Sequence, residues 1–134
     1  MGRLLKLLAF THGEAIAVRT LTGSNVLLVP DRHFALVFDW SSAMTYPEFI
    51  PRAVQTDEVA HAAKAVFAAI GGDPQTGHYP YLRDGDDESR QYVDFLWRLA
   101  SGRVSTAEKA HTQFYELVDA LYGKKFHPFT TLPL

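Results

Sequence analysis

Residues 34–40 read FALVFDW, and both alternating faces of this stretch are apolar. As a strand, it would place its large side chains on one side: Phe34, Leu36, Phe38 and Trp40. The other side carries Ala35 and Val37, where a solvated antiparallel sheet would show polar residues. Something besides water must therefore cover that second face: a helix of the same chain, a second copy of the chain or a foreign partner.

Three other stretches in the first forty residues are expected to be strands, and short turn-forming links separate all four. The strands are predicted at residues 4–10, 14–21, 25–29 and 33–39. Links of hairpin length favour pairing between consecutive strands, which predicts an antiparallel meander. The first stretch has an alternative, because Leu4, Leu5, Leu7 and Leu8 also fit one face of a short helix.

The second half of the chain changes to a helical period. Residues 57–70 carry an apolar stripe that includes Val59, Val66 and Phe67, and Gly71 with Gly72 would end the helix. Alanines cover much of its remaining surface, so neighbours could approach it closely on two sides.

Two more helices are predicted from their capping residues. Acidic residues 86–88 suit the N-terminus of a second helix, which ends at Gly102. Ser105 and Glu108 match a capping box at the start of a third helix, which ends at Gly123. The predicted fold class is therefore α+β, with a small antiparallel meander of three to four strands followed by three packed helices.

Length and composition favour one domain over residues 1–134, mainly β over 1–40 and mainly α over 57–123, with a docked tail at 124–134. The absence of cysteine rules out disulfides, thiolate catalysis and cysteine zinc sites, and it suits a cytoplasmic protein. No stretch predicts a membrane span. A net charge of -2 makes nucleic acid an unlikely partner.

No catalytic or metal-binding pattern is present, so no catalytic residue, metal ligand or cofactor is assigned. His12 and Glu14 have the spacing of a zinc deaminase motif, but the cysteines that motif requires are missing. The acidic run at 84–88 lacks the glycine and the glutamate that a calcium-binding loop needs at Ser89 and Phe95.

Two long connections, residues 41–56 and 72–85, are rich in aromatic residues and arginine, which dominate binding hot spots. The predicted partner-binding residues are Tyr46, Arg52, Tyr79, Tyr81 and Arg83. Tyr79 and Tyr81 are expected to be displayed, whereas Trp40 is expected in the core.

These features predict a non-enzymatic intracellular protein-binding domain, such as an inhibitor or adaptor of mobile-element or phage type that occupies a partner surface, and a homodimer is one form that such binding could take. One alternative is a small enzyme or ligand-binding module. Its pocket would lie between sheet and helices, with these candidates: Asp31, His33, His78 and His111. A second alternative is nucleic-acid contact through a basic and aromatic tail: Lys124, Lys125, Phe126 and His127.

Overall fold

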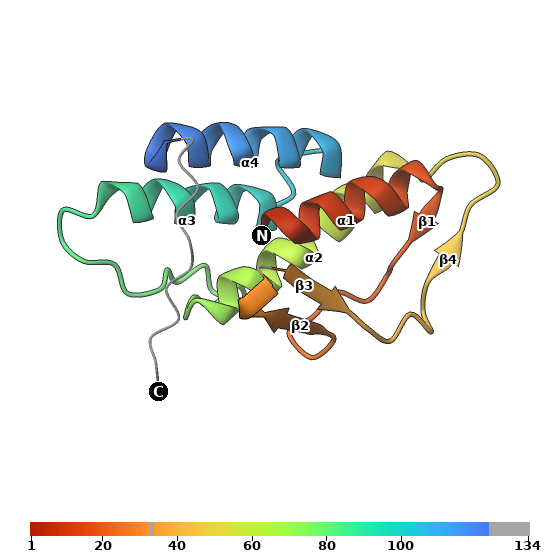
Figure 1. The fold of residues 1–134 in the computed structure, drawn as a ribbon, viewed down its shortest axis with the longest axis horizontal. Coiled ribbons are helices and arrows are strands. Elements are labelled where there is room, and N and C mark those ends of the chain that lie inside the picture. Colours follow the sequence, from red (N-terminus) through yellow and green to blue (C-terminus); the bar gives the residue numbers. More distant parts are fainter. Residues whose placement is uncertain (33, 124–134) are drawn as a thin grey trace.

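The computed structural model describes residues 1–32 and 34–123, and within them it has four α-helices and two small antiparallel sheets (Figure 1). The elements in chain order are α1 (Gly2–Gly13), β1 (Ile16–Ala17), β2 (Val26–Val29), the 3-10 turn η1 (Pro30–Arg32), β3 (Phe34–Val37), β4 (Met44–Thr45), α2 (Arg52–Ala69), α3 (Asp87–Ala100) and α4 (Ala107–Tyr122). Each sheet has two strands, β1 with β4 and β2 with β3. The predicted α+β class is confirmed, with somewhat less strand than expected.

The strand predicted for residues 4–10 is wrong, because this segment lies inside α1. The buried face of the helix is formed by residues at helical spacing: Leu4, Leu5, Leu8, Thr11 and His12. The last two are polar, so an apolar pattern read from the leucines alone stops one turn too early. The helical alternative for this stretch is the correct one.

Helix α1 packs closely on α4. A Cβ atom at Gly2 would lie 2.7 Å from the ring of Phe114, so this approach requires glycine. The main core joins α1 to the other helices through buried side chains that include Leu5, Val59, Leu99 and Phe114. A smaller cluster is centred on Phe67.

The strand predicted for residues 14–21 is much shorter than expected. Ala15 has φ of 57° and Arg19 has φ of 68°, so the extended backbone is interrupted on both sides of β1. Strand β1 pairs with the distant β4, with Ile16 opposite Thr45, and β2 pairs only with β3. The four stretches therefore do not form one continuous meander.

The three predicted helices are confirmed, with differences at their N-termini. Helix α2 begins at Arg52, directly after the N-cap residue Pro51, so it starts five residues before the predicted helix and ends one residue before it. The Asp86 carboxylate accepts a hydrogen bond from the backbone N–H of Ser89 (3.1 Å) at the start of α3. At α4 the cap is Thr106, which accepts from the N–H of Lys109 (3.2 Å), and not the predicted Ser105.

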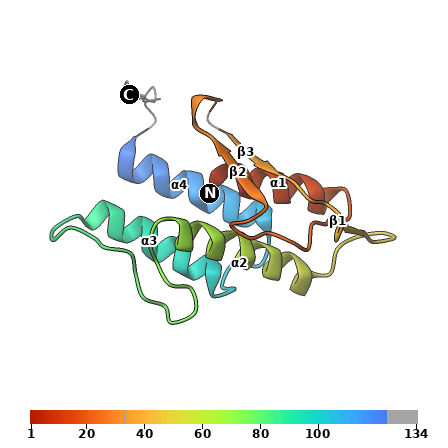
Figure 2. The same cartoon turned by 90° about the horizontal axis from the view of Figure 1, so that it is seen from below.

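The β2–β3 hairpin lies on the opposite side of the molecule from α4 (Figure 1). Seen from below, its two strands project beyond the neighbouring helices (Figure 2). Over the described residues, no helix combines the length and the apolar character needed to cross a bilayer.

Candidate functional site

The β2–β3 hairpin has one face on the core and one face in solvent. Its register pairs Val26 with Val37 and Leu27 with Leu36. The side chains of Val26, Ala35 and Val37 pack against the main core. The chain itself therefore covers this side of the sheet at Val26, Ala35 and Val37, whereas Leu28 on the same side is 68% exposed.

The opposite side of the hairpin carries the larger side chains. Leu27, Leu36 and Phe38 are exposed by 54%, 47% and 51%. These three residues are called the hairpin face below. They are adjacent, because Leu27 and Leu36 are cross-strand partners and Phe38 follows Leu36 by two positions on the same side.

Trp40 was expected in the core, and this prediction is wrong, because 40% of the residue is exposed. Asp39 has φ of 62°, which ends the alternation of β3 before Trp40. The indole therefore turns back along the strand, and its Nε1–H donates to the carbonyl oxygen of Val37 (2.9 Å). Trp40 therefore bonds a carbonyl at the outer edge of β3 instead of packing in the core.

The predicted partner-binding residues lie near the two ends of α2. Tyr46 and Arg52 are at its N-terminal end, and the segment with Tyr79, Tyr81 and Arg83 follows its C-terminal end. An 18-residue helix is about 27 Å long. The structure therefore divides the predicted residues between two separate regions.

Within these regions the side chains differ in exposure. Tyr81 is the most open, with 90% of the residue exposed, and Arg52 and Arg83 are also exposed. Tyr46 is partly buried, and its backbone N–H donates to the carbonyl oxygen of Ala15 (2.8 Å). Tyr81 and Arg83 are thus the residues of the predicted set that a partner could reach together.

Tyr79 is anchored to the helices, although it was expected to be displayed. Its hydroxyl donates to Asp94 Oδ1 (2.7 Å), and its ring packs edge-on against Phe67 with centroids 5.8 Å apart. Desolvation, together with the hydrogen bond and the negative charge of Asp94, raises the pKa of Tyr79 to about 12. Tyr79 holds the loop in place and presents Tyr81 beyond it.

The alternative pocket does not form among the candidates that can be described. Asp31 and His78 are exposed, and His111 packs on Tyr115 with ring centroids 4.7 Å apart. No hydrogen bond joins any two of Asp31, His78 and His111, and no group of three metal-binding side chains occurs within residues 1–32 and 34–123. His33 and the tail candidates at 124–127 lie outside the described residues.

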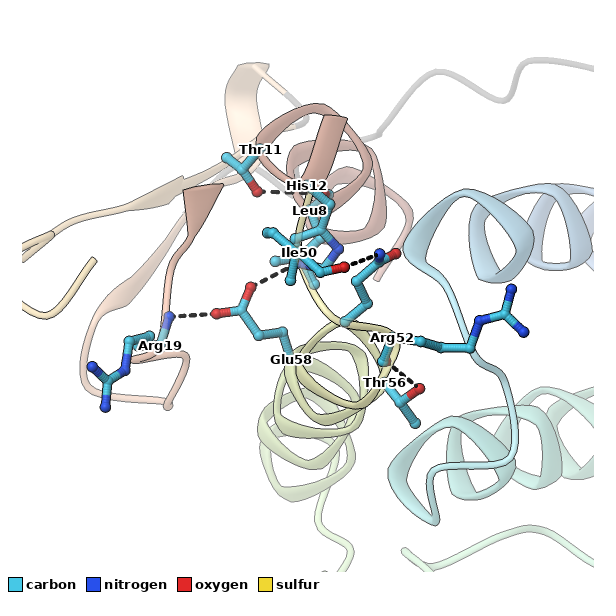
Figure 3. Close-up of polar contacts among 9 residues, drawn as sticks. Leu8, Thr11, His12, Arg19, Ile50, Arg52, Thr56 and Glu58 are labelled. Atoms are coloured by element: carbon cyan, nitrogen blue, oxygen red, sulfur yellow. Dashed lines mark hydrogen bonds and ion pairs between the residues drawn. The ribbon is translucent and has the colours of Figure 1, made fainter. Parts of the chain in front are cut away.

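Sequence reasoning missed a buried polar cluster around Glu58 of α2 (Figure 3). The Nε2–H of His12 donates to Glu58 Oε2 (2.7 Å), and the backbone N–H of Arg19 donates to Glu58 Oε1 (2.5 Å). The side chains of His12 and Glu58 are only 5% and 4% exposed. Because both carboxylate oxygens are bonded and neither side chain is open to a substrate, the cluster acts as a structural link between α1, α2 and the segment after β1.

No sequence pattern marked this pair. Glu58 is next to apolar positions in a helix whose other charged residues face solvent, and His12 is 46 positions away. Only folding brings the two together.

Comparison of the chain with protein-family models, with curated proteins and with solved structures finds no match.

Proposed function

We propose that this chain is a non-enzymatic protein-binding domain that contacts its partner through the hairpin face. The observation that carries the proposal is the exposure of Leu27, Leu36 and Phe38 beside a core that leaves them uncovered. The three side chains form one uninterrupted apolar area with no charged residue inside β2 or β3.

The free energy of burial supports this surface as a binding site. Removal of apolar area from water contributes roughly 25 cal/mol per Å². About half of each of these leucine and phenylalanine residues is still exposed, so a partner that covers them would gain this free energy on binding. Side chains on a strand pair that is already formed before binding also lose less conformational entropy than side chains on a segment that orders on binding. An inhibitor or adaptor that occupies a partner surface needs only such a face and no catalytic group.

The loop that carries Tyr81 is a second candidate binding surface. The residue is 90% exposed on a loop that Tyr79 fixes to α3, and the exposed Arg83 follows two residues later. Tyrosine and arginine are the residue types most enriched in binding hot spots. The loop would then be the contact region that the sequence predicted.

Site-specific photo-crosslinking in cells of the source organism tests the proposal. A photoreactive phenylalanine analogue replaces Phe38 in one variant, Tyr81 in a second and Tyr115 in a third. Tyr115 is the matched control, because it is 42% exposed on α4, away from both surfaces. We expect a discrete protein adduct at position 38 and none at position 115.

Adducts only at position 81 would move the binding site to the loop. If neither position 38 nor position 81 gave a discrete adduct, the protein-binding function would be excluded. The mass of an adduct also identifies its partner as another chain of 15.0 kDa or as a different protein.

A further inference from the structure

The hydrogen-bond pattern of the hairpin shows which backbone groups point away from it. The N–H of Phe38 donates to the carbonyl oxygen of Asn25 (3.0 Å), so these two residues are a hydrogen-bonded pair. In an antiparallel ladder such pairs alternate with pairs whose N–H and C=O groups point outward. With the observed register, the outward groups belong to Val26 and Leu28 on β2 and to Ala35 and Val37 on β3.

The two outer edges of the hairpin differ. On β3, the Trp40 indole bonds one of the four outward groups, the carbonyl of Val37. On β2, no residue in the described part of the chain bonds to the outward groups of Val26 or Leu28, and β2 has β3 as its only neighbouring strand. An unprotected edge is a template for another strand, and proteins normally block such edges when they are not used.

We propose that a second copy of the chain pairs with this β2 edge, and that the two hairpin faces together form the binding surface. The inference rests on the proposed function of the hairpin face. The two β2 strands run antiparallel about a two-fold axis, with Leu27 opposite Leu27 of the second copy. Val26 then pairs with Leu28 in both directions, and four N–H to carbonyl hydrogen bonds satisfy all the outward groups of both strands.

The chemistry of β2 favours a second copy as the occupant. The strand reads VLLV, so no charge is buried or repelled when it pairs with itself. The same register places Asp31 opposite Gly23 of the second copy, so no like charges meet beyond the ends of the strand. The antiparallel arrangement also limits the assembly to a dimer, because each chain has one β2 edge and uses it once.

Pairing of the edges makes one surface from two halves. The strand order becomes β3, β2, β2 and β3, and the hairpin faces join into a continuous apolar stripe across the axis. One hairpin face exposes roughly 300 Å² of apolar area, and two side by side expose up to roughly 600 Å², so pairing moves the patch from the lower to the upper end of the range in which exposed patches are often functional. The second copy therefore enlarges the apolar surface that a partner could contact.

The absence of native cysteine allows a direct test of the register. Leu27→Cys places one thiol from each chain at the axis, where opposed Cα atoms are about 4.5 Å apart and a disulfide can form. Leu36→Cys is the matched control on the same face, because its two Cα atoms would be about 15 Å apart. Mild oxidation of the purified full chain should link Leu27→Cys into covalent dimers and leave Leu36→Cys as monomers.

Equal cross-linking of both variants would overturn the edge pairing, because it indicates packing of one hairpin face on the other. Failure of both variants to cross-link would overturn it as well.

A second pair of variants tests the edge without thiols. Leu28→Pro removes an outward N–H that β3 does not use, and proline is tolerated at such edge positions. Leu28→Ala removes the same side chain but keeps the N–H. In sedimentation velocity over a concentration series, the wild type and Leu28→Ala should reach the dimer, and Leu28→Pro should remain monomeric with unchanged circular dichroism.

A dimer that persists in folded Leu28→Pro would contradict the pairing. If the monomeric Leu28→Pro still gave undiminished partner adducts at position 38, the proposal that two hairpin faces together form the binding surface would be wrong. The protein-binding function of a single chain would stand. Absence of adducts at both position 38 and position 81 in the otherwise unchanged chain would instead exclude the protein-binding function itself.

Discussion

Glu58 Oε2 of α2 lies 2.7 Å from His12 Nε2 of α1, and the two side chains form a buried pair. The other carboxylate oxygen of Glu58 accepts the backbone N–H of Arg19. One side chain therefore holds α1, α2 and the chain after β1 together. A group in this position stabilises the fold chiefly because its loss leaves buried partners unsatisfied.

Replacement of Glu58 should be strongly destabilising unless hydrogen bonding is kept. Glu58→Ala leaves a buried imidazole and a backbone N–H without acceptors, and we expect it to lower the free energy of unfolding by about 3 kcal/mol. Glu58→Gln retains a carbonyl oxygen for Arg19 and an amide that can bond to His12 in its neutral form, so its loss should be smaller. Denaturant unfolding monitored by circular dichroism measures both. Equal losses in the two variants would show that the hydrogen bonds contribute little.

Gly72→Ala should destabilise the smaller core cluster. A Cβ atom at Gly72 would collide with the ring of Phe67, which is fully buried and packs against Trp97 at a centroid distance of 5.3 Å. Because the ring has no space to move, we expect a cost of about 2 kcal/mol in denaturant unfolding. Gly23→Ala is the control, since a Cβ atom there meets nothing within 4 Å. A similar stability for both variants would mean that Phe67 can reorient.

The stability of the chain should fall at alkaline pH because of Tyr79. Its pKa is raised from 10.0 to about 12 in the folded state, so the protonated phenol contributes fully below pH 10 and its contribution is lost as pH rises toward about 12. Tyr79→Phe should therefore weaken the alkaline loss of stability relative to the wild type. Tyr81→Phe, at a side chain in solvent, should leave that loss unchanged. Thermal unfolding across this pH range tests the difference, and identical profiles for wild type and Tyr79→Phe would contradict the assignment.

A polar substitution should lower the free energy of unfolding at one residue of β3 and leave it almost unchanged at the adjacent residue. Val37→Asn puts an amide against the core and should cost about 2 kcal/mol of unfolding free energy. Leu36→Asn changes a side chain that faces solvent within one chain, so its effect in dilute solution should be within about 0.5 kcal/mol. Denaturant titrations of both variants measure this contrast. Equal costs would mean that the register of the hairpin differs from the observed one.

Local chemistry made much of the helical half predictable. Asp86 caps α3 because an acidic side chain accepts a nearby backbone N–H, and that interaction involves residues three positions apart. The apolar stripe of α2 could also be predicted from the sequence, because its residues are only three or four positions apart. In α1, polar His12 completes the helical stripe, and its reason for being buried is a carboxylate 46 residues away.

The same contrast applies to the candidate site. Alternation along residues 34–40 predicted two apolar faces, because adjacent side chains of a strand point in opposite directions. The sequence did not show which of the two faces would be exposed to solvent. That depended on α1 and the core, which lie against Ala35 and Val37. The position of Trp40 likewise depended on the positive φ of Asp39, which no nearby pattern indicated.

By itself, the amino-acid sequence determined the class of the fold, three of the helices and the two apolar faces of the hairpin, since periodicity and capping act over a few residues. Only the tertiary structure decided that Leu27, Leu36 and Phe38 face solvent, that β2 keeps an open edge and that Glu58 joins three segments. These features depend on contacts between residues far apart in the chain, and such contacts exist only once the core has formed.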